Sequence, residues 1–361
     1  MATTATIPII DISADGVNQE QVAKELVDAA VEYGFVYIKN AGREISIKQI
    51  ENAFNVSRIL FKSPPEDKQR CKIEKNNQGW SGMHTETLDP KTQRVGDFKE
   101  GFNFGPFANG KATQPIPQSI EPYQEQLSAF REACHELCRK LLLLFGIGLG
   151  VNPPSFFTTA HSPTAPSGSI LRFLYYPPPS STPDASPDDV RAGAHSDYGS
   201  VTLLFRLRGQ AGLEILNPTT STSTSESWSP VPVSPPGTST DPSPPILVNI
   251  GDLLSYWTGG LLRSTVHRVA FSPDPNMIAP GETATEPRYS VVYFCHPAND
   301  TPLAPVPSER VKAAAMAKIN GGSNSNPYAE PKVLTALEHL QMRLRATYLQ
   351  MYGDDGKAER K

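Results

Sequence analysis

The chain has 361 residues, of which 38% are hydrophobic and 19% charged, a composition that can bury a full-sized core and excludes global disorder. Its formal net charge of −4 provides no basic field, so nucleic acid is not an expected partner and any ligand should be small. Thirty-five prolines, about twice the number expected at ~5% usage, disfavour a helical bundle and favour turns and short strands.

The sequence predicts neither a secretory leader nor a membrane segment. The N-terminus lacks a basic region followed by an apolar run, and no apolar stretch reaches ~18 residues. The four cysteines have the spacing of neither a zinc site nor a disulfide framework, so Cys134 and Cys138 are predicted to be core-facing thiols on a helix. We therefore expect a cytoplasmic protein without membrane contact.

The first 150 residues predict short strands alternating with amphipathic helices. Strands are expected at residues 7–12 and 35–38, and helices at residues 18–33, 46–61 and 119–149. Gly34 ends the first helix, and Ser46 is the candidate N-cap of the second. The segment 79–107, which contains several aromatic residues, is predicted to be loop-rich. Together these elements form a predicted N-terminal domain, residues 1–150, whose helices and strands pack on the rest of the chain.

Residues 151–361 form the second predicted domain, in which the hydrophobic period changes from helical to strand-like. Short strands are expected at residues 170–176, 201–207, 213–216, 246–250 and 289–294. Short β-branched and aromatic strands separated by turns predict an antiparallel sandwich or jelly roll. A last helix is predicted from about Val333 to Met351.

Two low-complexity segments interrupt this second half, at residues 177–189 and 217–245. In the second segment, 22 of 29 residues are Ser, Thr or Pro. Such a composition buries too little apolar surface to offset the entropy of ordering. We therefore predict a mobile insert at residues 217–245, anchored by Trp228.

Candidate metal ligands occur in the strand-rich half. His195 and Asp197 are separated by one residue, so an extended backbone places both on the same face. His267 lies downstream in a β-branched segment and is a candidate third ligand, although a lone His on a strand is more often a core or rim residue. Two imidazoles and one carboxylate leave positions open on a metal, an arrangement suited to non-haem Fe(II) enzymes that bind an organic acid and O2.

An anion site is indicated on the strand that begins near Arg288. The even-numbered residues of 288–296 share one face, which places Arg288 and Ser290 among apolar neighbours. Buried Arg and Ser side chains are costly unless they meet an anion, and Arg offers a planar fork for a carboxylate. The alternative is a salt bridge to a carboxylate of the protein itself.

The order of these motifs, HxD, distal His and RxS, resembles the 2-oxoglutarate and Fe(II)-dependent dioxygenases of the isopenicillin N synthase-like family. Residues 7–11, 34–38, 171–177 and 248–252 match the same family, and residues 97–103 resemble a loop of its thymine hydroxylase-like and fungal secondary-metabolite members. The resemblance covers nearly the whole chain. It implies a mainly β fold with α elements, a distorted double-stranded β-helix (jelly roll) with N-terminal helices outside it and a C-terminal helix near the active-site mouth.

The resemblance also implies roles for individual residues at the metal and the cosubstrate. His195, Asp197 and His267 match the Fe(II) ligands of the family. Arg288 and Ser290 match the residues that hold the distal carboxylate of 2-oxoglutarate.

Further residues are implied to contact the cosubstrate or the substrate. Tyr176 falls where family members often contact 2-oxoglutarate through a tyrosine hydroxyl, although Leu174 departs from the Asn that is common in the plant enzymes. Phe294 matches a position that often packs on the substrate, and Asn103 and His296 lie at candidate pocket positions. Trp80, Met83, Phe102 and Phe104 indicate an apolar substrate pocket, although aromatic residues in a Pro-rich protein more often serve ordinary packing.

The implied activity is oxidation of a small organic molecule, expected to be a secondary-metabolite intermediate, with O2 and 2-oxoglutarate consumed and succinate and CO2 released. Hydroxylation is expected, with desaturation or ring rearrangement also open. One alternative is a 2-oxoglutarate-independent Fe(II) oxidase of the isopenicillin N synthase type, in which Arg288 and Ser290 bind the substrate's own carboxylate. Another is a non-catalytic module that binds a small ligand on the same fold. The sequence is silent on oligomeric state.

Overall fold

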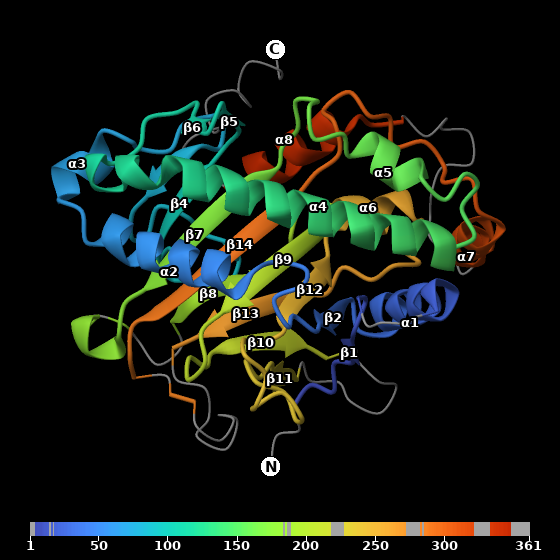
Figure 1. Ribbon diagram of the computed structural model, residues 1–361, viewed down its shortest axis with the longest axis horizontal. Helices are drawn as coiled ribbons and strands as arrows, with labels where there is room; N and C mark the ends of the chain where they lie inside the picture. The colour runs from blue at the N-terminus through green and yellow to red at the C-terminus, as the bar shows by residue number, and fades with distance from the viewer. Residues whose placement is uncertain are drawn as a thin grey trace.

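Two β-sheets face each other in the structure, a computed structural model that describes residues 4–13, 16, 18–182, 185, 189–217, 227–271, 282–283, 285–320 and 333–347 (Figure 1). The larger sheet has eight strands in the order β1-β2-β12-β9-β14-β7-β4-β3. These strands are β1 (Ile9–Ile10), β2 (Phe35–Ile38), β3 (Gly79–Ser81), β4 (Glu100–Phe104), β7 (Ile170–Tyr176), β9 (Val201–Arg206), β12 (Ile246–Ile250) and β14 (Arg288–Cys295). The architecture is the predicted jelly roll.

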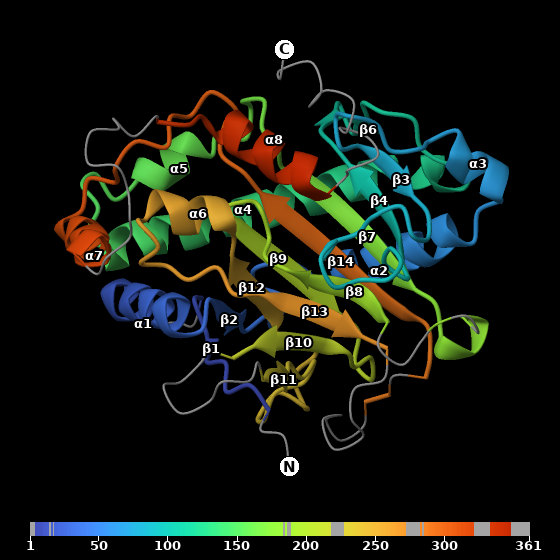
Figure 2. The same cartoon turned by 180° about the vertical axis from the view of Figure 1, so that it is seen from behind.

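The smaller sheet has four strands in the order β11-β10-β13-β8. They are β8 (Val190–His195), β10 (Leu213–Leu216), β11 (Trp228–Pro230) and β13 (His267–Ala270), and the short strands β5 (Phe107–Ala108) and β6 (Lys111–Ala112) form a separate hairpin. Figure 2 shows the smaller sheet in front of the larger one. Apolar residues from both sheets fill the space between them, including Tyr37, Leu213, Leu247, Val269 and Val292.

Helices cover the opposite face of the larger sheet. The long helices are α1 (Gln19–Glu32), α2 (Ile47–Phe61) and α4 (Gln124–Gly148), and Figure 1 shows α2 and α4 crossing the sheet. Shorter helices are η1 (Gln118–Tyr123), η2 (Pro179–Ser181), α3 (Pro65–Gln69), α5 (Phe156–Ala160), α6 (Asp252–Trp257), α7 (Glu309–Asn320) and α8 (Ala336–Thr347). None of the described helices is long and apolar enough to span a membrane.

The helix boundaries agree with the predicted start signals. The Asn18 side chain accepts hydrogen bonds from the first turn of α1, and Ser46 forms a reciprocal capping box with Gln49 at the start of α2. Cys134 and Cys138 are fully buried on α4 as free thiols, as predicted. The last helix, predicted from about Val333 to Met351, is observed as α8 over Ala336–Thr347. Residues 348–351 lie outside the described residues.

The N-terminal strands are hydrogen-bonded into the larger sheet rather than only packed on it. Strand β2 pairs with β12, so that Phe35 lies opposite Asn249, and β4 pairs with β7, so that Asn103 lies opposite Arg172. The larger sheet is therefore built jointly by strands from residues 1–150 and strands from the later part of the chain. The division at residue 150 stays a prediction.

The segment 79–107 is loop-rich over residues 82–99, as predicted, but it also forms β3 and β4 near its ends. Phe102 and Phe104 are fully buried in the core under the helices. Because side chains alternate across a strand, Asn103 points to the opposite face, between the sheets. Of the two interpretations of Phe102 and Phe104, the structure therefore supports ordinary packing.

The insert 217–245 also differs from its prediction. Residues 218–226 lie outside the described residues, but 227–245 are packed against the sheets. Arg206 donates hydrogen bonds to the carbonyl oxygens of Val231 (2.7 Å) and Pro232 (2.8 Å), and Arg268 stacks over the Trp228 ring at 4.1 Å. The composition argument fails here because a buried arginine satisfies the backbone carbonyls of the segment.

Gly34, between α1 and β2, gives a test of this packing. Its φ is +69°, and a Cβ built there would lie 2.3 Å from the Arg263 carbonyl oxygen. Gly150 also has a positive φ, +63°, but a Cβ built there would have no neighbouring atom within 4 Å. Substitution Gly150→Ala should cost about 1–2 kcal/mol of stability, because only the backbone is strained. Gly34→Ala should cost at least about 3 kcal/mol, because backbone atoms must also move.

Denaturant unfolding of both variants measures this difference in stability. Equal losses would contradict the close approach of Gly34 to Arg263.

Candidate functional site

The three predicted metal ligands meet between the sheets. His195 ends β8 and lies directly opposite His267, the first residue of β13, with ring centroids 4.3 Å apart. Nε2 of His195 is 3.8 Å, and Nε2 of His267 is 3.7 Å, from Asp197 Oδ1. The candidate ligand atoms of these three side chains all lie within 4.8 Å of one another. Among the described residues, this is the group of His, Cys and acidic side chains that could hold a metal ion.

Hydrogen bonds orient all three side chains. Nδ1 of His195 lies 2.7 Å from the Gly193 carbonyl oxygen, and Nδ1 of His267 lies 3.2 Å from that of Thr265. A carbonyl can only accept, so each Nδ1 carries the proton and each Nε2 presents a lone pair to the centre. Asn249 donates to the second oxygen, Oδ2, of Asp197 at 2.7 Å, which leaves Oδ1 facing the imidazoles.

The electrostatics favour the metal-binding protonation states. Burial, together with the neighbouring His267, lowers the pKa of His195 to about 3. Burial alone would raise the pKa of Asp197, but His267, His195 and the hydrogen bond from Asn249 outweigh it and lower this pKa. Neutral imidazoles and an ionised carboxylate are the forms that bind metals.

A chamber on one side of the three ligands, here called the inner chamber, contains the predicted anion site. Arg288 is 2% exposed and Ser290 is 1% exposed. Arg288 Nε and Nη1 and Ser290 Oγ have no hydrogen-bond partner among the described residues. The inner chamber is also lined by Phe35, Leu174, Tyr176, His195, Asp197, Thr202, Leu204, Leu213, Asn249, His267, Val269, Val292 and Phe294.

The unpaired donors of the inner chamber indicate an anionic ligand. The Arg288 guanidinium lies over the Tyr176 ring, 4.8 Å from its centroid. Burial lowers the pKa of Arg288, which shows that the cation is poorly solvated. A buried cation with free N–H groups costs energy unless an anion completes its hydrogen bonds. The protein carboxylate of the alternative interpretation is not found bonded to Arg288 among the described residues.

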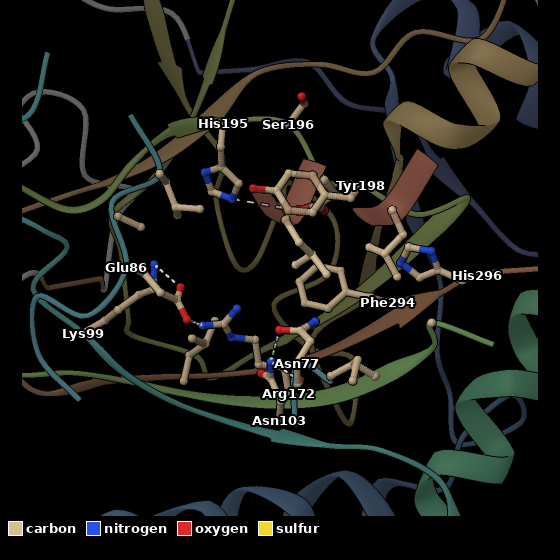
Figure 3. Close-up of a pocket in the computed structure, with 18 of the residues that line it drawn as sticks. Asn77, Glu86, Lys99, Asn103, Arg172, His195, Ser196, Tyr198, Phe294 and His296 are labelled. Carbon is tan, nitrogen blue, oxygen red and sulfur yellow. Dashed lines mark hydrogen bonds and ion pairs between the residues drawn. The ribbon is translucent and has the colours of Figure 1, made fainter. Parts of the chain in front are cut away.

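A second, outer chamber lies on the other side of the ligands (Figure 3). It shares Leu174, Tyr176, His195, Asp197 and Phe294 with the inner chamber. Its remaining lining residues are Asn77, Glu86, Leu88, Lys99, Asn103, Gly168, Ile170, Arg172, Ala192, Ser196, Tyr198, His296, Leu340 and Leu344. Two members of the candidate metal group, His195 and Asp197, therefore border both chambers.

Paired charges line one side of the outer chamber. Lys99 lies 3.1 Å from a Glu86 oxygen and also contacts Asp97, and Arg172 contacts the other Glu86 oxygen. Burial would lower the pKa of Lys99, but Asp97 and Glu86 outweigh it and raise this pKa. The cluster is thus two cations and two anions that neutralise one another.

Helix α8 covers the end of the sheets at which the outer chamber lies (Figure 2). Arg343 of α8 is 2.7 Å from Asp252 Oδ2, which also accepts a hydrogen bond from Ser196 Oγ at 3.0 Å. The Asp252 backbone N–H donates to the Asp197 carbonyl oxygen at 2.7 Å. One residue therefore connects the covering helix to the loop that carries a candidate metal ligand.

The structure brings together the residues singled out in the sequence. His195, Asp197 and His267 form the metal group, and Arg288, Ser290 and Tyr176 line the inner chamber. Phe294, Asn103 and His296 line the outer chamber. Trp80 instead donates a hydrogen bond to Glu100 at 2.9 Å.

Sequence reasoning missed the residues that support this site. Asn249 lies in segment 248–252, and Asp97 and Lys99 of the charged cluster lie in segment 97–103; both segments carry the family resemblance, but these three residues received no individual roles. The signal for Asp97 and Lys99 is their i, i+2 spacing, which places two opposite charges on one face of an extended segment. The resemblance implied a C-terminal helix near the active-site mouth, but it gave the lining residues of α8 no individual roles.

Comparison with known proteins identifies similar chains over most of this length. Residues 7–136 match the family model for the N-terminal part of non-haem dioxygenases in morphine synthesis, and residues 167–297 match that of the 2OG-Fe(II) oxygenase superfamily. A 2-oxoglutarate-Fe(II) type oxidoreductase of Metarhizium majus is 30% identical over 349 residues, covering 86% of this chain and 89% of the relative. A UPF0676 protein of Schizosaccharomyces pombe is 36% identical over 306 residues, covering 84% of this chain and 86% of the relative.

Solved structures give the same result. A Neurospora crassa protein in complex with alpha-KG and thymine has a TM-score of 0.70 and 25% identity, over 94% of this chain and 96% of that one. The likeness spans both the helical N-terminal region and the facing sheets.

The Asn249 contact predicts a loss of metal affinity without loss of fold. Asn249→Ala frees Asp197 Oδ2, and removal of such a supporting hydrogen bond typically weakens metal binding about 10- to 100-fold. Asn40→Ala is the matched control, because Asn40 is a buried amide bonded to the Ile45 carbonyl away from the site. Anaerobic Fe(II) titration should show weak binding for the first variant and ordinary binding for the second. Similar affinities would show that Asn249 does not position Asp197.

Proposed function

Because the chain belongs to the 2OG-Fe(II) oxygenase superfamily, and is a 2-oxoglutarate-dependent dioxygenase that uses Fe(II) and O2, we propose that His195, Asp197 and His267 hold the Fe(II). Three observations support this set: the convergence of their ligand atoms, their orienting hydrogen bonds and the lowered pKa values of His195 and Asp197. Two imidazoles and one carboxylate are the donor set of non-haem Fe(II) oxygenases. The residues present therefore fit the metal.

We further propose that Arg288 and Ser290 hold the distal carboxylate of 2-oxoglutarate. The observation that carries this proposal is the pair of buried side chains with unsatisfied donors beside the metal group. Arg288 supplies N–H groups in a planar fork, and Ser290 supplies one O–H. Tyr176 lies directly opposite Arg288 on β7 and supports the guanidinium through its ring.

The substrate is proposed to occupy the outer chamber, against Phe294, Asn103 and His296. Burial lowers the pKa of His296 to about 3, so this imidazole is neutral and suits an uncharged ligand. Leu340 and Leu344 of α8 close the chamber with apolar surface and help to exclude water. The protein needs no general base for this reaction, because its residues act by orienting one C–H bond towards the metal face.

When bound, Fe(II) and 2-oxoglutarate supply the activation of O2, with release of succinate and CO2 and oxidation of a C–H bond. We propose hydroxylation of a small organic molecule, a secondary-metabolite intermediate. The apolar surface of Ile170, Phe294 and Leu340 and the similarity to a fungal oxidoreductase support this choice. The cytoplasmic location expected from the sequence stays a prediction.

An anaerobic titration tests the proposed assignments. The parent protein with Fe(II) should develop a weak visible charge-transfer band as 2-oxoglutarate is added. His267→Ala should abolish the band, because only two ligands are left. Arg288→Ala should raise the 2-oxoglutarate concentration for half-saturation about 100-fold or more, since a charge-assisted pair is lost.

Arg288→Lys is the matched control for charge. It keeps the cation but loses the planar fork, so we expect an intermediate effect. An unchanged band in Arg288→Ala would overturn the assignment of the carboxylate site. Substrate oxidation without 2-oxoglutarate would instead indicate an oxidase, and unchanged ligand binding in Asp197→Ala would indicate a non-catalytic module.

A further inference from the structure

Asn103 presents a fixed hydrogen-bond acceptor to the outer chamber. Its side-chain Nδ2 donates to the Asn77 carbonyl oxygen at 2.9 Å and to Asn77 Oδ1 at 3.0 Å. A backbone carbonyl can only accept a hydrogen bond, so the atom facing it must be the nitrogen. The amide of Asn103 therefore cannot be flipped, and its oxygen faces away from Asn77 (Figure 3).

That oxygen is buried and unsatisfied. Asn103 is 2% exposed, and its Oδ1 has no hydrogen-bond partner among the described residues. A buried acceptor without a donor is costly, so native structures rarely keep one without a purpose. Because Asn103 lines the outer chamber, a ligand bound there is the candidate donor for this oxygen.

The same chamber offers no unbalanced charge from its acidic and basic cluster. Glu86 bridges Lys99 and Arg172, and Lys99 also contacts Asp97. An anionic ligand would have to compete with Glu86 for these cations, and a cationic ligand would have to compete with them for Glu86. Either exchange breaks a buried ion pair, which is strongly unfavourable.

Arg172 is held in place by the strand beneath it. A Cβ at Gly101 would lie 2.8 Å from Arg172 Nη2, so the glycine allows the guanidinium to lie across β4 towards Glu86. Asn103 is directly opposite Arg172 on the neighbouring strand. Asn103 and Arg172 therefore lie on the same face of the larger sheet as Ile170 and Phe294, and Leu340 and Leu344 of α8 complete the lining of the chamber.

From this arrangement we propose that the outer chamber selects an uncharged molecule that donates an N–H or O–H group to Asn103 Oδ1. Asn103 is thus a specificity-determining residue, and the substrate class is a largely apolar amide, lactam or alcohol. This inference rests on the proposed function, because it takes the outer chamber to be the substrate site.

Matched lactams can test the proposal by direct binding. The probes are 2-quinolone, N-methyl-2-quinolone, 3-methyl-2-quinolone and quinoline-6-carboxylate, which cannot chelate Fe(II), together with caprolactam and N-methylcaprolactam. Their dissociation constants are measured by calorimetry on the anaerobic protein loaded with Fe(II) and 2-oxoglutarate. The ring-methylated quinolone has the bulk of the N-methyl form but keeps the N–H donor.

We expect the N–H forms, the ring-methylated one included, to bind about tenfold or more tightly than the N-methyl forms, since an N-methyl ligand leaves Asn103 Oδ1 buried without a donor. In Asn103→Ala this preference should fall to about twofold or less. Gln114→Ala is the control, because Gln114 Nε2 donates to the Asn103 carbonyl at 2.6 Å without supplying the acceptor. That variant should keep the preference.

Four results would overturn the proposal: equal affinity for N–H and N-methyl forms, a preference that survives Asn103→Ala, tightest binding of the carboxylate, or binding of none of the probes. Tight carboxylate binding would place the ligand in the adjoining crevice that contains Lys75 and Arg345. The charge-transfer band is recorded first for each variant. Loss of the band in the parent would refute the proposed function, whereas a normal band without selectivity would refute this inference alone.

Discussion

The site depends on one pairing in the smaller sheet, that of His195 with His267. These residues are direct partners in the antiparallel ladder between β8 and β13, so their imidazoles are brought together by backbone hydrogen bonding before any metal is considered. A shift of one residue would turn one histidine to the opposite face of the sheet. The ladder is irregular directly after this pair, between His267 and Val269, and again between Val269 and Ala270. Asp197 is the second residue after the end of β8, and its carboxylate lies beside the same two imidazoles.

Two chambers border the candidate metal group, and they differ in the hydrogen-bonding groups that line them. On one side, Arg288 and Ser290 offer only donors, which suits a small dianion. On the other side, the charges are mutually paired and Asn103 offers an acceptor. A single cavity with both sets of groups would bind either ligand in either place. His195 and Asp197 border both chambers, so under the proposed function cosubstrate and substrate would occupy separate chambers beside the same ion.

Sequence patterns predicted β7, β10 and β12 to their observed ends, because these strands are β-branched or aromatic and bounded by turn residues. They failed at β4, where Glu100 and Gly101 weaken the strand pattern and where alternation sends Phe102 and Asn103 to opposite faces. The candidate metal and carboxylate residues could be singled out because each motif is local or repeats a known order. The contacts of Asn249, Glu86 and Arg343 were not, since each joins segments far apart in the chain and leaves no periodic signal.

The pairing of β2 with β12 has a consequence for synthesis of the chain. Residues 35–38 are made early, yet their antiparallel partners are residues 246–250, and β4 likewise needs β7. When the ribosome has released only the segment through α4, these strands have apolar faces and open edges without partners. Such long-range pairing is slow to form, and the exposed edges are prone to association with other chains. We therefore expect the nascent N-terminal two fifths of the chain to benefit from protection by a chaperone until its sheet partners emerge.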